Sequence, residues 1–263
     1  WHTGMHSTAR YFYQDSGDSH EMINRRQAAA ESNITLFSEP DISNTVFLHN
    51  GIDESLCQDI ALSVTNHIGE KLQTVLSDIK MCSRETIDIS VDDHIDYKAF
   101  LQGKRGMLTV EYMTTGVFPR VMFLNEISDG EFSVEHSNFG QSIEADSDCL
   151  LTSQPDRNLL FSLPVLPEGY RTEIDIYPTF PILKSSYSLR VTCEDFAGVE
   201  LSTEEITLNR EYPFHQHKCD SYGDTYNVQI DYMNPEKLPN RFHTAVHYRH
   251  HHSMLPGITL DGP

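Results

Sequence analysis

The sequence has few basic residues, and this scarcity excludes several kinds of partner. Its 263 residues include Lys+Arg 19 against Asp+Glu 39, which gives a formal net charge of −20. A nucleic-acid-binding protein needs clustered Lys and Arg to displace the counterions of phosphate, and no stretch of this chain provides such a cluster. We therefore expect no nucleic-acid partner. A protein partner with a basic surface fits the charge better, because long-range electrostatic attraction steers association.

Long apolar runs and recognised catalytic motifs are also absent. No run of about 18 apolar residues occurs, so the sequence predicts no membrane-spanning helix. The GxSxG, SxxK and HExxH motifs of common hydrolases are missing. The five cysteines contain no CxxC pair, and we expect reduced thiols rather than a disulfide framework. These absences favour a non-catalytic binding or assembly subunit that docks to a protein partner in a larger complex.

The N-terminal region carries the candidate partner-binding residues. Tyr11, Phe12 and Tyr13 are consecutive aromatic residues in an otherwise polar arm, where they can anchor on a neighbouring subunit. The chain starts with Trp1 and not with methionine. An organelle or cell-envelope lumen, reached after N-terminal processing, is therefore one expectation for its location.

The first third of the chain is expected to contain helices. Asp18 can cap a short helix over residues 19–32, where the QAAAE tract at 27–31 has high helix propensity. This segment belongs to an N-terminal arm over 1–52. Apolar residues then recur every four positions, which predicts an amphipathic helix over 53–84 that packs on a sheet. The recurring residues are Leu56, Ile60, Val64, Ile68 and Leu72.

After about residue 85 the hydrophobic period changes from four to two. In one example, Ile174 and Ile176 alternate with Glu173 and Asp175. Such alternation indicates antiparallel strands with one buried and one solvated face. We therefore predict a mainly β (α+β) fold, with an antiparallel β-sandwich or jelly-roll-like core over 85–250 and an N-terminal helical segment. If the sandwich region holds two units, the seam is expected near 180, and 251–263 form a C-terminal tail.

One candidate metal site follows from side-chain spacing. His215, His217 and Cys219 lie two positions apart in turn, so an extended segment places all three on the same face. Imidazole and thiolate are ligands that Zn²⁺ and Cu²⁺ accept. The alternative is a His-rich surface loop, and the spacing does not decide between the two.

A second candidate metal site rests on a family resemblance. His94 and Asp96 form an HxD pair, followed by PRVMFLNEISDGEF at 119–132 and PVLPEGYRTEI at 164–174. Together these motifs resemble Fe(II)/2-oxoglutarate-dependent oxygenases. The resemblance implies that His94 and Asp96 ligate iron and that Arg171 binds the carboxylate of the co-substrate.

The match to the oxygenases departs at the third iron ligand. That family has a second His about ten residues before the Arg, whereas residues 160–162 here are Leu, Phe and Ser. No His lies between His136 and His215. The alternative function is therefore an oxygenase-like protein, in an active or a degenerate form.

A third alternative is a carbohydrate-binding module. The stretches LPVLPEGYRTEIDIYP at 163–178 and SSYSLRVTCEDFAGVELSTEEITL at 185–208 resemble the C-terminal carbohydrate-binding sandwiches of polysaccharide exporters. The shared features are a Pro/Gly turn before a strand and an acidic-Gly turn after the next one. The resemblance implies a sandwich fold and glycan binding, although one fold serves many functions.

Overall fold

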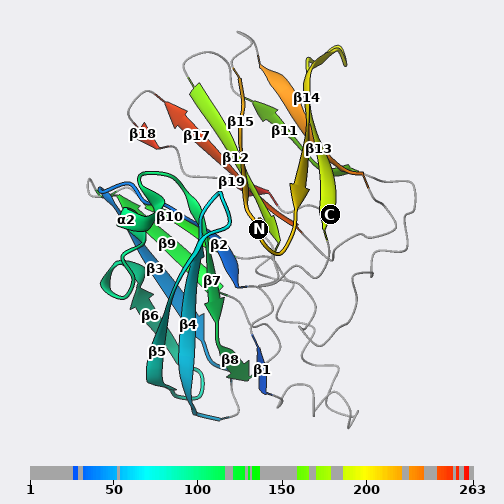
Figure 1. Cartoon of the computed structure of the whole chain (residues 1–263). Helices are drawn as coiled ribbons and strands as arrows, with labels where there is room; N and C mark the ends of the chain where they lie inside the picture. Colours follow the sequence, from blue (N-terminus) through cyan, green and yellow to red (C-terminus); the bar gives the residue numbers. More distant parts are fainter. Residues whose placement is uncertain are drawn as a thin grey trace.

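Antiparallel β-sheets make up most of the part of the chain that the structure describes, and this part contains almost no helix (Figure 1). The computed structural model describes residues 26–28, 32–51, 54–115, 121–127, 130, 132–136, 159–165, 170–178, 186–220, 225–233, 242–250, 253–254 and 258–260. The helical elements in these ranges are a 3₁₀ turn, η2 (Val91–Asp93), and a short helix, α2 (Tyr97–Leu101). No helix in the described ranges has the length and apolar character needed to cross a membrane.

The N-terminal unit consists of two facing sheets. One sheet has the order β2 (Asn33–Leu36), β7 (Gly106–Glu111), β4 (Leu56–Thr65) and β5 (Lys71–Met81). The other has the order β10 (Phe132–His136), β9 (Val121–Ile127), β3 (Ile42–His49) and β6 (Thr86–Ser90). Their inner faces share one core that includes Ile34, Leu62, Val46 and Phe123, which makes the arrangement sandwich-like. A short ribbon of β1 (Arg26–Ala28) and β8 (Met113–Thr115) completes this unit.

The C-terminal unit repeats this arrangement with its own core. One sheet has the order β11 (Leu159–Val165), β16 (Tyr226–Tyr232), β13 (Tyr187–Glu194) and β14 (Glu200–Leu208). The other has the order β15 (His215–Lys218), β12 (Tyr170–Pro178), β17 (Phe242–His250) and β18 (Ser253–Met254), with β19 (Ile258–Leu260) also on β17. Ile174 and Ile176 of one sheet pack against Leu189 and Val228 of the other.

The prediction of antiparallel strands after residue 85 is confirmed. The alternating stretches form β7, β9, β10, β12, β13, β16 and β17, and the continuous apolar run before Val165 forms β11. The position of a seam near 180 is not supported, because Ile176 and Tyr187 on either side of it belong to the same core. The N-terminal unit instead ends its last strand at His136, and the C-terminal unit begins its first strand at Leu159.

The predicted amphipathic helix over 53–84 is wrong, because these residues form the hairpin of β4 and β5. A period of four is also a multiple of two, so the apolar stripe suits the inner face of a strand equally well. Ile60, Leu62 and Val64 are accordingly buried on β4. The turn is set by Asn66, whose side chain accepts hydrogen bonds from the amides of Ile68 and Glu70. Gly69 follows with a φ of 81°, a conformation that few other residues adopt.

The predicted N-terminal helix over 19–32 is not supported. Its residues 26–28 form β1, which pairs with β8 in the register Arg26↔Thr115 to Ala28↔Met113. Helix propensity is a weak preference that strand pairing overrides. The remainder of this prediction, up to residue 25 and at 29–31, lies outside the described residues.

A buried ion cluster joins the two units. The guanidinium of Arg105, in the N-terminal unit, donates from Nε to Asp175 Oδ2 at 2.6 Å and from Nη2 to Asp175 Oδ1 at 2.9 Å. A further donor, Nη1, pairs with Glu173. Glu173 is 2% exposed and Asp175 is fully buried, so the expectation of a solvated face on β12 is wrong. The cause is that β12 packs against its own core on one side and against the N-terminal unit on the other.

Hydrogen bonds and apolar contacts continue the interface along β12. Asn33 Nδ2 donates to the carbonyl of Pro178 at 2.7 Å, and the Thr35 hydroxyl bonds to the Tyr177 hydroxyl at 3.2 Å. Met107 meets Tyr177 and Phe214 in a small third core. The outer face of β2 and β7 is thus covered, and every residue of β2 is buried.

We expect Arg105→Ala to lower the free energy of unfolding by about 3–5 kcal/mol, because it removes a buried cation that donates to two buried carboxylates. The matched control is Arg190→Ala, which removes an exposed pair with Glu205 at 3.3 Å. Exposed pairs contribute about 0–1 kcal/mol. Chemical denaturation of both variants measures the difference. Equal losses would contradict a structural role for the buried cluster.

Candidate functional site

The HxD pair lies in the N-terminal unit, between η2 and α2. His94 and Asp96 are both exposed, and neither belongs to a cluster of three metal-ligating groups in the described part of the chain. The acidic residue with structural partners here is Asp92. Its carboxylate accepts from the Asn44 amide and the Tyr97 hydroxyl, each at 2.9 Å, and pairs with Lys98 at 2.6 Å.

The other predicted site residues fall in different places. Arg171 is on β12 of the C-terminal unit, where its backbone pairs with Arg249, and its side chain is not among those described. The oxygenase-like arrangement of Arg171 with His94 and Asp96 therefore stays a prediction. Tyr11, Phe12 and Tyr13 lie outside the described residues.

The predicted pair His215 and His217 lies on β15, at the edge of its sheet. In the pairing with β12, His215 stands opposite Ile176 and His217 opposite Ile174. Those isoleucines are fully buried in the core of the C-terminal unit, so the histidines share the core-facing side of the sheet. The two-residue spacing of His215 and His217 predicted that their side chains share one face of a strand, and the structure shows this arrangement.

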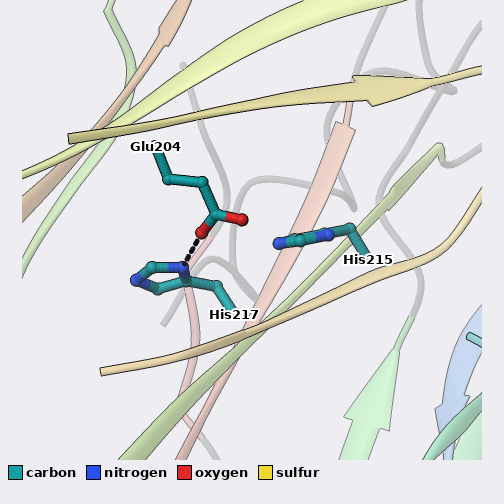
Figure 2. A group of neighbouring side chains, drawn as sticks. All are labelled: Glu204, His215 and His217. Atoms are coloured by element: carbon teal, nitrogen blue, oxygen red, sulfur yellow. Dashed lines mark hydrogen bonds and ion pairs between the residues drawn. The ribbon is translucent and has the colours of Figure 1, made fainter. Parts of the chain in front are cut away.

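The third member of the cluster comes from the facing sheet. Glu204 lies on the edge strand β14, two residues before the buried Ile206 and four before Leu208, and so points to the core side. Its carboxylate oxygen Oε2 lies 2.9 Å from His217 Nδ1. The contact is a hydrogen bond when the imidazole is neutral and an ion pair when it is protonated. Figure 2 shows the imidazole of His215 pointing toward this carboxylate. Glu204, His215 and His217 are named here the His–Glu cluster.

The His–Glu cluster has the geometry of a ligand set. One ligand atom from each residue lies within 4.8 Å of the other two. The imidazole rings of the two histidines are stacked, with centroids 6.4 Å apart. Burial lowers the pKa of His215, although the negative charge of Glu204 opposes this shift. The neutral imidazole, which has a lone pair that can bind a metal ion, is therefore favoured. Glu204 itself is half exposed, which leaves the cluster accessible from solvent.

Cys219 is close to the cluster in sequence but is not part of it. It follows β15, and its amide donates to the carbonyl of Thr172 at 3.1 Å. Its side chain packs against the core of the C-terminal unit. Burial raises the pKa of the Cys219 thiol to about 12, so the thiolate that binds metals is disfavoured.

Sequence reasoning missed Glu204. It is one of 39 acidic residues, and it lies on another strand of another sheet, eleven positions before His215. The available signal was its position in the alternating row with Ile206 and Leu208, where an apolar residue is expected.

A second surface of interest is an apolar strip on the outer face of β9 and β10. Met122, Phe132 and Val134 are 46%, 66% and 56% exposed. In register, Val134 stands opposite Leu124, and Met122 stands opposite Phe47 on β3, both of which are partly exposed. These five residues are named here the docking strip. Glu126 and Asp88 lie at exposed positions on the same face, beside Phe132 and Phe47 respectively.

Comparisons with known proteins identify no family. No family model and no curated protein matches the chain. Among solved structures, a glycosyl hydrolase family 2 member from Bacteroides cellulosilyticus is 8% identical with a TM-score of 0.18, covering 87% of this chain and 27% of that one. A lectin from Pleurotus ostreatus is 7% identical with a TM-score of 0.21, covering 91% and 76%. A putative β-galactosidase from Bacteroides fragilis is 8% identical with a TM-score of 0.19, covering 87% and 31%. The chain thus spans about a quarter of the first of these, and TM-scores this low carry no argument about function.

Two acidic residues of the HxD segment should respond differently to substitution. Asp92→Ala removes the acceptor for Asn44 and Tyr97, and we expect it to lower the free energy of unfolding by about 1–3 kcal/mol. Asp96→Ala changes an exposed carboxylate and should stay within about 0.5 kcal/mol of the wild type. Thermal or urea unfolding of the two variants measures this. A larger loss for Asp96→Ala would indicate that this segment has a role that the described contacts do not explain.

Proposed function

We propose that this protein is a non-catalytic binding or assembly subunit, built on two β-sandwiches, that docks to a protein partner through the docking strip. The observation that carries this proposal is the exposure of Met122, Phe132 and Val134 on the same face of the neighbouring strands β9 and β10. Soluble proteins seldom leave a contiguous apolar surface exposed unless something binds there. Large apolar side chains are also those that contribute most to the energy of protein interfaces.

The charge of the chain favours a partner of stated chemistry. Glu126 and Asp88 are exposed on the face of the strip, and no Lys or Arg occupies a described outward position on β3, β6, β9 or β10. The whole chain carries a net charge of −20. The complementary partner surface is therefore apolar at its centre and basic at its rim. The N-terminal arm with Tyr11, Phe12 and Tyr13 remains a predicted second contact.

The position of the strip suits a docking role mechanically. β10 is the edge strand of its sheet in the described structure, and its free edge is next to the exposed side chains of Phe132 and Val134. Edge strands offer unpaired backbone groups to another chain. A partner can thus combine side-chain contacts on the face with backbone hydrogen bonds at the edge.

The test is site-specific photo-crosslinking in the native source. A photoreactive phenylalanine analogue at position 134 is expected to give one discrete cross-linked partner, and the same analogue at position 196 is the control. Phe196 is 68% exposed but lies in the turn between β13 and β14, far in sequence and in another sheet. A cross-link of equal yield at both positions, or none at 134, would refute docking through the strip.

Point variants and salt then test the chemistry of the contact. Phe132→Asp should abolish the cross-link from position 134, whereas Phe196→Asp should leave it unchanged. Raising the salt from about 0.1 M to about 1 M shortens the Debye length from about 10 Å to about 3 Å and should weaken a complex that charge helps to form. Salt-independent binding would contradict the basic partner. A cross-link to a second copy of the chain would replace the foreign partner by self-association.

A further inference from the structure

We infer that Glu204, His215 and His217 bind one divalent transition-metal ion of the Zn²⁺ class at the open edge of the C-terminal unit. This inference is independent of the docking strip, which lies in the other unit. It rests on the positions of three ionisable side chains, on the separations of their ligand atoms, and on the buried Nε2 of His215, which has no hydrogen-bond partner among the described residues.

The His–Glu cluster occupies core-facing positions on two edge strands. A core-facing position on an edge strand is ordinarily filled by an apolar side chain, as Ile206 and Leu208 show on the same strand β14. Here two strands from opposite sheets place a carboxylate and two imidazoles at such positions, directed at one another (Figure 2). Removing such groups from water is costly unless each is bonded.

The described structure leaves the imidazoles of the cluster incompletely hydrogen-bonded. Nε2 of His215 is buried and has no hydrogen-bond partner among the described residues. Nε2 of His217 is also buried without such a partner, but it lies on the side of the ring away from Glu204, whose carboxylate bonds Nδ1. The Nε2 atom of an imidazole is either a donor or an acceptor, and in both states a buried one needs a partner. Figure 2 shows the tip of the His215 ring directed into the space between Glu204 and His217, where a bound ion would satisfy it.

The ligand atoms of the three residues lie close enough together to share one ion. Two ligand atoms that each bind a tetrahedral zinc ion at about 2.1 Å lie about 3.4 Å apart. The separation between Glu204 Oε2 and His217 Nδ1 is 2.9 Å, and no separation among the three ligand atoms exceeds 4.8 Å. Small side-chain rotations therefore suffice to bring all three to an ion, without movement of the strands.

The ligand types determine the class of ion. Two imidazoles and one carboxylate suit Zn²⁺, Cu²⁺ and related ions, whereas Mg²⁺ and Ca²⁺ prefer oxygen ligands throughout. Three protein ligands leave the fourth position of a tetrahedral ion to water or to a group from outside the chain. Because β14 and β15 belong to opposite sheets, the bound ion would link the two sheets at this edge and stabilise the folded C-terminal unit.

The test measures Zn²⁺ binding to the full chain after treatment with a chelator and dialysis. Calorimetric titration of the wild type should show a site of one ion per chain that Mg²⁺ does not occupy. Glu204→Ala and His217→Ala should each weaken this site at least about tenfold. Glu205→Ala, at the next position on the opposite face of β14, and His94→Ala, in the rival HxD pair, should bind as the wild type does.

The His-rich C-terminal segment requires its own variant. His250, His251 and His252 can bind zinc without any folded site. A triple variant with Asn at these positions should retain the tight site. If the tight site disappears in this variant and persists in Glu204→Ala and His217→Ala, the inference is overturned.

Thermal unfolding separates metal binding from damage to the fold. In the presence of a chelator, Glu204→Gln should unfold at the wild-type temperature, because its side chain is half exposed and keeps its shape. Added Zn²⁺ should raise the unfolding temperature of the wild type progressively, since a ligand that binds only the folded state stabilises it by mass action. Added Zn²⁺ should leave the unfolding temperature of Glu204→Gln at the value measured in the presence of the chelator. Equal stabilisation of both proteins by Zn²⁺ would overturn the assignment even if the alanine variants did not fold.

Discussion

The architecture depends on one guanidinium that compensates two carboxylates of another folding unit. Arg105 presents a fork of donors to Asp175 and a further donor to Glu173, all three side chains being buried. Burial alone would lower the pKa of Arg105, but the two carboxylates outweigh it and raise that pKa, which favours the cation. Lysine has a single point charge and could not match this planar arrangement. Since neither partner is tolerable without the other, the contact fixes which face of β12 meets the N-terminal unit.

The orientation of β12 in turn determines the geometry of β15, the edge strand with which it pairs. With Glu173 and Asp175 directed at Arg105, the alternate residues Ile174 and Ile176 must point into the core of the C-terminal unit. The register with β15 then places His217 opposite Ile174 and His215 opposite Ile176, so both histidines face the same core. A shift of one residue in this register would turn both imidazoles to the opposite face and away from Glu204. The ion cluster and the His–Glu cluster therefore lie on opposite faces of the paired strands β12 and β15.

The comparison of sequence and structure shows which physical signals are local. Strands with clear alternation, such as Tyr187–Glu194, could be predicted because one face is buried and the other solvated. The hairpin of β4 and β5 was mistaken for a helix because an apolar period of four satisfies both geometries, and only Asn66 and Gly69 marked the turn. The burial of Asp175 could not be predicted, since its counter-ion is 70 residues away in another unit. The same holds for Glu204, whereas the spacing of His215 and His217 was sufficient to predict their shared face.

The composition of the His–Glu cluster argues that its position has a purpose other than closing a sheet. A protein that needed only to protect this edge could use apolar residues, as it does elsewhere on β14 and β12, or exposed lysines, which discourage pairing with other chains. Two imidazoles with buried Nε2 atoms satisfy neither need, because they are costly to bury and offer no repulsive charge when neutral. The hydrogen bond between Glu204 and His217 compensates Nδ1 of His217, whereas the buried Nε2 atoms of both rings have no partner among the described residues. An ion bound by all three side chains would give the buried His215 Nε2 the partner that it lacks in the described structure.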